Sequence, residues 1–341
     1  MKSPWQDRSV LITGVCGTVG SALLKLLLEE PVKEVIGIDC NETELFFVDQ
    51  QYRDEKRVSL YLCDIKNRVQ LKRYFREGGI VLHTAARKHV IINELAPQEA
   101  VQTNIIGTQN VIDSAIDAGS DRVIFTSSDK AVNPTNVMGT SKLMGERLMT
   151  AANAMTSNQP PIFASTRFGN VLGSNGSVIP IFQRQIEAGG PVTVTDMDMS
   201  RFVMTLDEAA KLVLQSVFLA KGGEVFVTKM PSLNIGDLAK AMIAIAKDEK
   251  GDQAQEVDIS IIGAKPGEKL FEELINEEEV RRTVEIEDYF AVLPAWQSVH
   301  GEIDYRYGDQ QTQVDRIYRS DLESKMNVEE IQSYLQTNEL V

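Results

Sequence analysis

Short apolar runs alternate with helical segments throughout the first half of the chain. The runs are typical of strands buried on both faces, and they lie at residues 9–13, 35–39, 58–63, 80–84, 122–127 and 162–167. Helical spacing of apolar residues lies between most of them, at residues 21–28, 67–76, 101–118 and 139–155. Strands and helices that alternate in this way build right-handed βαβ units. We therefore expect an α/β fold with a doubly wound parallel sheet.

The second half of the chain has a different texture. Residues 169–180 are rich in Gly, Asn and Ser, and residues 277–287 are rich in charge. Apolar patterns predict helices at 206–220, 235–247 and 328–335, and strands at 224–228 and 257–262. We interpret this half as a smaller lobe interleaved with the first domain. The predicted division assigns residues 1–173, with later contributions near 202–230, to the first domain, and residues 174–201 and 231–341 to the lobe.

The composition limits the possible partners. The 341 residues include 49 acidic and 35 basic side chains, which give a formal net charge of −14. Nucleic acids and anionic membranes attract basic surfaces, so neither is expected as a partner. No apolar run approaches the roughly 18 residues of a membrane span, and the three Cys and three His lack metal-binding spacing. We expect a soluble, cytoplasmic protein with reduced thiols and no metal.

The turn after the first strand carries the motif TGVCGTVG, at residues 13–20. Its glycines allow the backbone to approach a pyrophosphate, which the N-terminus of the following helix attracts. Asp39 ends the next strand, where a carboxylate accepts both ribose hydroxyls and repels a 2′-phosphate, so NAD is favoured over NADP. Asp64 is either an adenine-side contact or a strand-end cap. The predicted NAD-binding residues in this part of the chain are Gly14, Gly17, Thr18, Val19, Gly20, Asp39, Asp64, Ile65 and Ala85.

Several later blocks carry a family resemblance. SSDK at residues 127–130 follows the fifth strand, and MGTSK follows at residues 138–142. With the glycine motif and Asn104, they resemble the extended short-chain dehydrogenase/reductases, which have a Rossmann fold. More narrowly, the chain resembles UDP-N-acetylglucosamine 4,6-dehydratases of the polysaccharide-biosynthesis type over residues 9 to about 275. The blocks that carry this resemblance are HTAARKHV, SSDKAVNPTNVMGTSK, RFGNVLGSNGSVIP, MSRFVMTLDEA and KPGEKLFEEL.

The resemblance implies a lyase that uses bound NAD. Such enzymes oxidise C4 of the sugar, remove the C5 proton, expel the C6 hydroxyl as water and return the hydride to C6. By resemblance, Asp129 is the acid for the C6 hydroxyl and Lys130 is the base at C5, whereas an ordinary Asp-Lys dipeptide is a solvated loop pair. These roles need a protonated acid and a neutral amine. Burial would raise the pKa of Asp129 and lower that of Lys130, and the two neighbours should titrate as a pair.

Three more positions complete the implied set. By resemblance, Ser128 bonds the O4 region of the sugar, with a strand-end cap as the alternative. Lys142 bonds the nicotinamide ribose and raises the positive potential beside the ring. Asn104 is structural and holds a helix near the site.

Met138 departs from the superfamily pattern, which has a tyrosine there to take the alcohol proton. A thioether cannot accept that proton usefully. The chain is therefore either an inactive NAD-binding relative or a dehydratase of a methionine-containing branch, and the intact Asp129-Lys130 pair favours the branch. The C4 hydroxyl proton would then leave through Asp129 or an ordered water. By resemblance, members with this methionine tend to retain the C5 configuration.

The later blocks imply the substrate contacts. Asn170 and the turn at residues 174–177 resemble the stretch that holds the nucleotide diphosphate. Arg201 and Lys265 would supply local cations, although many relatives have arginine at the second position. Glu268 is either a ribose acceptor or a helix-start carboxylate. The predicted substrate-binding residues are Lys88, Asn170, Ser174, Ser177, Val178, Arg201, Lys265 and Glu268.

The sequence thus predicts an NAD-dependent UDP-N-acetylglucosamine 4,6-dehydratase whose 4-keto-6-deoxy product serves surface-glycan or nonulosonic-acid biosynthesis. The alternatives are a GDP-sugar 4,6-dehydratase, a variant that releases a 5,6-ene, a nucleotide-sugar epimerase or reductase, and a non-catalytic NAD-sensing protein. Enzymes of the resembling family usually dimerise through two helices, here residues 101–118 and 139–155. We therefore expect a homodimer or an assembly of dimers.

Overall fold

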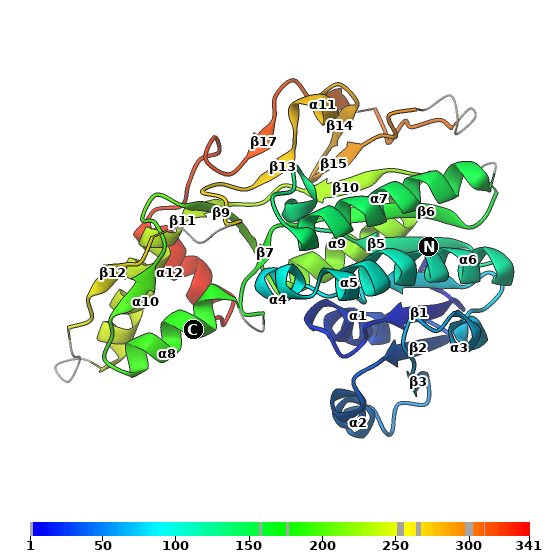
Figure 1. Cartoon of the computed structure of the whole chain (residues 1–341), viewed down its shortest axis with the longest axis horizontal. Helices are drawn as coiled ribbons and strands as arrows, with labels where there is room; N and C mark the ends of the chain where they lie inside the picture. Colours follow the sequence, from blue (N-terminus) through cyan, green and yellow to red (C-terminus); the bar gives the residue numbers. More distant parts are fainter. Residues whose placement is uncertain are drawn as a thin grey trace.

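One large β-sheet runs through the molecule (Figure 1). The computed structural model describes residues 3–156, 159–174, 177–250, 256–263, 267–296, 303–309 and 311–341. Within them the sheet has ten strands in the order β16-β14-β15-β10-β6-β5-β4-β1-β2-β3. The strands are β1 (Ser9–Thr13), β2 (Glu34–Asp39), β3 (Val58–Leu62), β4 (Ile80–His83), β5 (Arg122–Thr126), β6 (Ile162–Arg167), β10 (Val225–Thr228), β14 (Thr283–Ile286), β15 (Tyr289–Val292) and β16 (Thr312–Gln313).

The strands from β3 to β10 in this order pair in parallel. Their order reverses direction between β1 and β4, as in doubly wound sheets that bind dinucleotides. This confirms the predicted fold class. The six strands expected in the first half all form, with bounds within one residue of those predicted.

Helices cover both faces of the sheet because neighbouring strand residues point to opposite sides. Val10 and Ile12 of β1 belong to a core that α1 (Thr18–Glu29) and α9 (Leu206–Leu219) cover. Leu11, between them, belongs to a second core beneath α6 (Thr108–Ala118) and α7 (Val137–Met155). The nearly continuous apolar run at residues 9–13 is therefore explained by burial on both faces.

Several helices differ from the prediction. The helix expected over residues 101–118 is a π-helical segment η2 (Val101–Gly107) followed by α6. The helix expected over 67–76 is a short α3 (Arg68–Leu71) and a 3₁₀ turn η1 (Lys72–Tyr74). Within the described residues, the structure adds five α-helices that the patterns did not predict, namely α2 (Glu42–Gln51), α4 (Val90–Leu95), α5 (Pro97–Ala100), α8 (Val178–Glu187) and α11 (Glu277–Val280). The first is largely exposed, so its residues carry little apolar periodicity.

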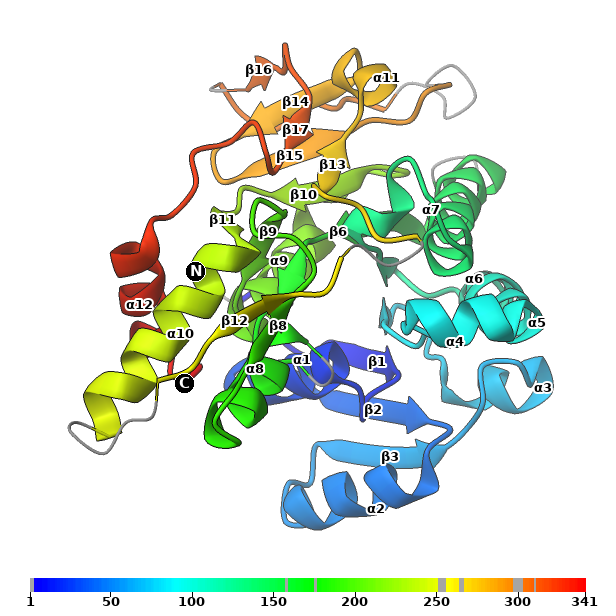
Figure 2. The ribbon, with the colours of Figure 1, turned by 60° about the vertical axis from the view of Figure 1, so that its left-hand side comes forward.

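A smaller lobe has its own hydrophobic core and lies beside the large sheet (Figures 1 and 2). Leu238 and Met242 of α10 (Ile235–Lys250) pack there with Ile331 of α12 (Val328–Thr337) and with Phe182 of α8. The remaining strands form small sheets, and they are β7 (Asn170–Val171), β8 (Val192–Val194), β9 (Ser200–Met204), β11 (Ser232–Asn234), β12 (Ile259–Ile261), β13 (Glu273–Ile275) and β17 (Tyr318–Arg319).

The structure corrects one part of the predicted division. Residues 283–292 form β14 and β15, and β15 pairs antiparallel with β10 of the large sheet. This hairpin covers the open edge of β10 with apolar residues such as Phe290, so it belongs with the sheet and not with the smaller lobe. We keep the rest of the division as a proposal.

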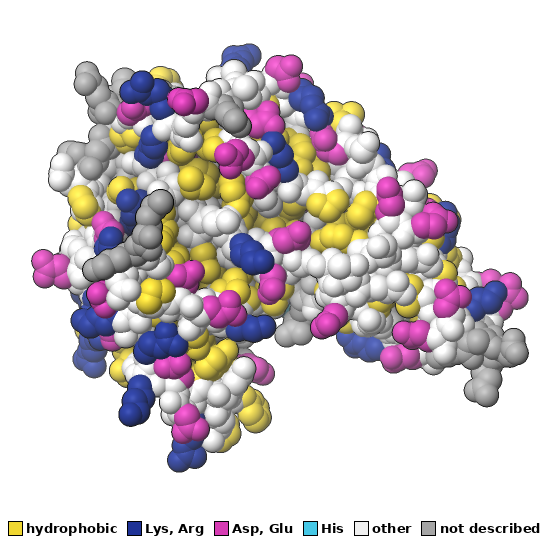
Figure 3. Space-filling model, turned by 180° about the vertical axis from the view of Figure 1, so that it is seen from behind, with side chains coloured by type: hydrophobic (Ala, Val, Ile, Leu, Met, Phe, Trp, Pro, Cys, Tyr) yellow, Lys and Arg dark blue, Asp and Glu magenta, His cyan; other side chains and the backbone are white. Residues whose placement is uncertain are grey.

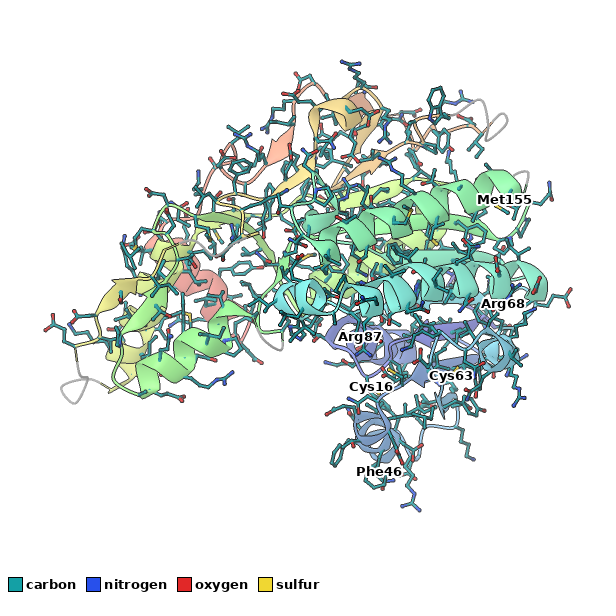
Figure 4. All side chains as sticks on the ribbon, viewed as in Figure 1. Cys16, Phe46, Cys63, Arg68, Arg87 and Met155 are labelled. Atoms are coloured by element: carbon teal, nitrogen blue, oxygen red, sulfur yellow. The ribbon has the colours of Figure 1, made fainter. Side chains whose placement is uncertain are left out.

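The carboxyl ends of the parallel strands face the smaller lobe. In Figure 4, Cys16 and Arg87, which follow β1 and β4, lie on the lobe side, whereas Arg68 and Met155 lie at the opposite side. Seen from behind, acidic and basic side chains are interspersed over the surface (Figure 3). Among the described residues, no helix combines the length and the apolar character that crossing a membrane requires.

Candidate active site

The glycine-rich turn joins β1 to α1 through close backbone contacts. Gly14 has a φ of 73°, and a Cβ there would lie 2.7 Å from the Cα of Ala85. A Cβ on Gly20 would lie 2.2 Å from the carbonyl oxygen of Gly14. Gly17 is the N-cap of α1, so the helix begins at Thr18. Only glycine fits these approaches, and the exposed N-terminus of α1 then faces any anion bound at the turn.

Asp39 and Asp64 lie at the ends of neighbouring strands. Asp39 Oδ2 accepts a hydrogen bond of 3.1 Å from the backbone N–H of Cys16, which ties the end of β2 to the glycine turn. Asp64 Oδ1 accepts from the N–H of Lys66 at 2.9 Å, as a local turn cap does. Ile65 is buried against Gly107 of η2. The turn, Asp39 and Ala85 therefore fit an adenine dinucleotide, while Asp64 caps its turn and also lies 3.5 Å from Lys66 Nζ.

A compact polar cluster follows β5. Ser128 is the N-cap of the 3₁₀ turn η3 (Asp129–Ala131), and its hydroxyl donates to Asp129 Oδ1 at 2.6 Å. Lys130 Nζ lies 3.1 and 3.0 Å from the two carboxylate oxygens of Asp129. Asp129 is 4% exposed, so this is not a solvated loop pair. The pair lies at the carboxyl end of a central strand, where doubly wound folds bind their ligands.

The pKa values of this pair run opposite to our expectation. Burial alone would raise the pKa of Asp129, but the Lys130 charge and the Ser128 hydroxyl hold it below its ordinary value. Burial alone would lower the pKa of Lys130, but the charges of Asp129 and Glu272 raise it. We had expected burial to determine both pKa values, and we had not included the electrostatic attraction between the two side chains, which has the opposite effect. In the resting site they form an ion pair.

Glu272 is the residue that our sequence reasoning missed. It precedes β13 and its side chain is 5% exposed. Its Oε1 atom lies 3.9 Å from Lys130 Nζ and 3.4 Å from Arg201 Nε, so Glu272 and Asp129 both contact the Lys130 ammonium. Burial and the charge of Asp129 raise the pKa of Glu272 to about 7. The KPGEKLFEEL block contained it, but no local pattern distinguishes it from the adjacent Glu273.

The first turn of α7 lies directly against η3. A Cβ on Gly139 would lie 2.1 Å from the carbonyl oxygen of Lys130, so glycine permits this approach. Met138, in the same turn, is 5% exposed. Lys142 Nζ donates to the carbonyl of Thr126 at 2.9 Å, and burial lowers its pKa to about 8.

Asn104 has the structural role that we expected. Its amide donates to the carbonyl of Arg87 at 3.0 Å and to Ser141 Oγ at 2.8 Å. Its carbonyl oxygen accepts from the N–H of Arg87 at 2.7 Å. Asn104, a residue of η2, therefore connects η2 both to the segment after β4 and to α7.

The predicted substrate residues fall into two groups. Asn170 and Arg201 lie beside the catalytic cluster, because Asn170 Nδ2 donates to Glu272 Oε1 at 2.8 Å. Arg201 also donates to the carbonyl of Lys269 at 2.9 Å and lies 3.9 Å from Glu268. Arg201, the side chain expected to bind the diphosphate, is thus paired with the carboxylates of Glu268 and Glu272 in this structure.

The second group lies at the start of α8. Ser177 is its N-cap and Val178 its first residue, and Ser174 N–H is 3.4 Å from the carbonyl of Val171. The buried Ser177 hydroxyl has no hydrogen-bond partner within the described residues. Lys88 is exposed in the segment after β4, whereas Lys265 lies outside the described residues.

Among the residues that the structure describes, no group of three or more His, Cys, Asp or Glu side chains could hold a metal ion.

A comparison with known protein families shows to which family this chain belongs. A family model described as polysaccharide biosynthesis protein matches residues 10–294, from β1 to the end of β15. The chain belongs to the polysaccharide biosynthesis protein family. Its fold is that of the extended short-chain dehydrogenase/reductases, as expected.

Curated relatives of this family member include enzymes with different reactions. It is 46% identical to an uncharacterized membrane protein of Methanocaldococcus jannaschii, over 85% of this chain and 87% of that protein. It is 36% identical to a UDP-N-acetylglucosamine 4,6-dehydratase (inverting) of Campylobacter jejuni, over 88% and 87%. It is 32% identical to a UDP-glucose 4-epimerase of Rickettsia rickettsii, over 98% and 97%.

Solved structures agree with this placement of the family member. The X-ray structure of Pen from Bacillus thuringiensis superposes with a TM-score of 0.89 and 37% identity, covering 99% of this chain and 100% of that one. DesIV of Streptomyces venezuelae, a dTDP-glucose 4,6-dehydratase solved with NAD bound, matches with a TM-score of 0.65 and 23% identity, over 77% and 86%. The second likeness shows a shared fold.

Proposed function

We propose that this protein is an NAD-dependent UDP-N-acetylglucosamine 4,6-dehydratase that supplies a 4-keto-6-deoxy sugar nucleotide for surface-glycan or nonulosonic-acid biosynthesis. The observation that carries the proposal is the Asp129–Lys130 contact after β5, in which a buried carboxylate pairs with a partly buried ammonium. An acid and a base in direct contact are what removal of water from neighbouring carbons needs. Epimerisation and simple reduction do not need this pair.

NAD is the cofactor that the glycine turn and Asp39 fit. The Gly14 and Gly20 approaches leave the N-terminus of α1 open to a pyrophosphate, and Asp39 is available at the end of β2. The NAD-bound DesIV structure supports the choice. When bound, NAD would accept a hydride from C4 of the sugar and return it to C6, so no reduced cofactor would accumulate.

The ion pair can reach the state that dehydration requires by one internal step. Lys130 Nζ lies 3.0 Å from Asp129 Oδ2, so transfer of one proton gives a neutral amine and a protonated acid. The amine then removes the C5 proton, and the acid protonates the leaving C6 oxygen. No proton from solvent is needed for this step.

Met138 leads us to propose that the C5 configuration is retained. Its buried thioether can pack against substrate or nicotinamide but cannot exchange protons. Lys130 would then both remove and return the C5 proton on one face. The relative from Campylobacter jejuni is named as inverting, so the configuration at C5 is a sharp test of this part.

Incubation with NAD and a panel of UDP- and GDP-sugars tests the function. We expect loss of one water from UDP-N-acetylglucosamine by mass spectrometry, without growth of the reduced-nicotinamide absorbance. An epimerase would leave the mass unchanged, and an NAD sensor would show a thermal shift with NAD but none with uridine nucleotides. In deuterated solvent, NMR of the product should show deuterium at C5 with the retained D-xylo configuration. An L-arabino product would refute retention.

We also propose a dimer, or an assembly of dimers, in the cytoplasm. The segments expected to form the interface expose apolar side chains, including Val101 and Ile106 of η2 and Met144 of α7. The described cysteines are unpaired thiols, as a reducing compartment maintains them. Light scattering at micromolar concentration should give at least twice the mass of one chain.

A further inference from the structure

Glu272 lies behind the catalytic pair and is held from several elements. Its Oε1 accepts from Asn170 of β7 at 2.8 Å, and its Oε2 accepts from the N–H of Phe202 of β9 at 3.1 Å. Its backbone N–H donates to Ser320 Oγ at 2.9 Å, which fixes the chain on the other side. A carboxyl placed this firmly beside Asp129 is part of the proton chemistry of the cluster or a scaffold for it.

The proposed reaction has one proton too many for the catalytic pair. Oxidation of C4 releases the hydroxyl proton, which Met138 cannot take. Dehydration requires Lys130 to have given its own proton to Asp129. Asp129 alone cannot hold both protons, so another acceptor is needed within reach of the pair.

We infer that Glu272 is this acceptor: it stores the C4 hydroxyl proton, received through Asp129, while Asp129 and Lys130 carry out the dehydration. The inference rests on the proposed function. Glu272 is a positioning residue that holds a proton for Asp129. It acts through Asp129 and is not required to touch the sugar. Lys130 Nζ lies 3.0 Å from Asp129 Oδ2 and 3.9 Å from Glu272 Oε1, so the two carboxyl groups share one ammonium, and this shared contact provides the path.

The protons and electrons balance in this scheme. Bound NAD would supply the acceptor for the C4 hydride, and the C4 hydroxyl proton goes through Asp129 to Glu272 as the carbonyl forms. Lys130 then protonates Asp129. The Lys130 amine takes the C5 proton and the C–H electron pair forms the C5–C6 double bond. The C6–O bond breaks as Asp129 protonates the C6 hydroxyl oxygen, which leaves as water.

The cycle closes when the hydride returns to C6 and Lys130 returns the proton to C5. Glu272 then gives its stored proton back to Lys130 through Asp129. The resting state, with one ammonium and two carboxylates, is restored.

The surroundings of Glu272 set the pH dependence. Asp129 and Lys130 face it from η3, Arg201 faces it from β9, and Lys269 from its own segment. Burial and the Asp129 charge together give Glu272 a pKa of about 7. Because the acceptor must be ionised, turnover should fall as the pH drops through about 7.

Glu272→Gln tests the inference, since it keeps the size and removes the titratable proton. We expect kcat to fall by about 100-fold at neutral pH, with KM changed by less than about threefold. The acidic limb of the pH profile should disappear. Glu272→Asp should restore the limb and part of the rate. Glu273→Gln is the matched control, because the neighbouring Glu273 accepts from Asn133 Nδ2 instead, and it should behave as wild type.

A wild-type pH profile and rate in Glu272→Gln would overturn the inference, since solvent would then be the acceptor. A second readout does not depend on turnover. Infrared spectra of the protein labelled with ¹³C-glutamate should show one carboxyl that titrates near neutral pH, absent from Glu272→Gln and shifted in Glu272→Asp. If no sugar nucleotide loses water, the proposed function fails, but this carboxyl still decides whether Glu272 holds a proton. Its absence from wild type refutes the store.

Discussion

The two ends of the proposed site are built in different ways. The dinucleotide end comes from one continuous turn at residues 13–20 and from Asp39, and its contacts are largely backbone approaches. The catalytic end is a group of charges in contact, the buried Asp129 and Glu272 and the partly buried Lys130, brought together from the chain's middle and its last third. Cofactor binding can therefore be specified locally, whereas proton transfer depends on charges that only the fold places side by side.

Lys130→Ala should have the largest effect, and that effect should be confined to the catalytic end of the site. Dehydration should fall at least about 1,000-fold, because no base remains at C5. Hydride transfer at C4 should be affected less, so reduced nicotinamide should be trapped on the enzyme and seen by its absorbance. Lys240→Ala, an exposed lysine of α10, is the control. An equal loss of dehydration and of hydride transfer at C4 would contradict the assignment of Lys130 to dehydration.

Adding one methyl group at either end should separate binding from chemistry. Gly20→Ala places a Cβ 2.2 Å from the Gly14 carbonyl and should lower NAD affinity about 100-fold, measured by calorimetry. Gly139→Ala places a Cβ 2.1 Å from the Lys130 carbonyl and should lower kcat about 100-fold with a smaller change in NAD affinity. If the two variants lost the same property, the comparison would fail.

Asp39→Ala should weaken NAD binding about tenfold, or about 1.4 kcal/mol. It removes the carboxylate that favours the ribose hydroxyls, so the preference for NAD over NADP should narrow. Competition binding with both cofactors measures the ratio. An unchanged ratio would count against the ribose role, whereas the rate at saturating NAD should stay near wild type.

Met138→Ala should have the smallest effect, a loss of less than about tenfold in kcat. Its thioether packs in the site but exchanges no proton, so only packing is lost. Steady-state kinetics and C5 analysis of the product provide the measurement. A loss as large as that of Lys130→Ala would show that Met138 has a chemical role.

The first half of the fold could be predicted because it follows local rules. Each of the first six strands, β1 to β6, is a short apolar run, and the glycine turn carries its own requirement for close backbone contact. The expected burial is wrong for β3, which lies at the edge of the sheet and is partly exposed. The helix α8 could not be predicted, because it begins in a turn rich in Gly, Asn and Ser and its stability comes from packing in the smaller lobe. Asn104 of the π-helical η2 hydrogen-bonds Arg87, which lies 17 residues earlier in the chain, so this contact too could not be predicted from local patterns.

The sequence by itself determined the doubly wound sheet, the position of the dinucleotide turn and the identity of Asp129 and Lys130. It did not determine their protonation, because burial and pairing have opposite effects on a pKa and only the distances decide which prevails. It also gave no sign that Glu272, and not Glu273, reaches the catalytic pair. That choice follows from the backbone at the start of β13, which turns one of two adjacent carboxylates toward Lys130 and the other toward Asn133. Side chains on alternate faces of an extended segment meet different partners, and only the tertiary structure places those partners.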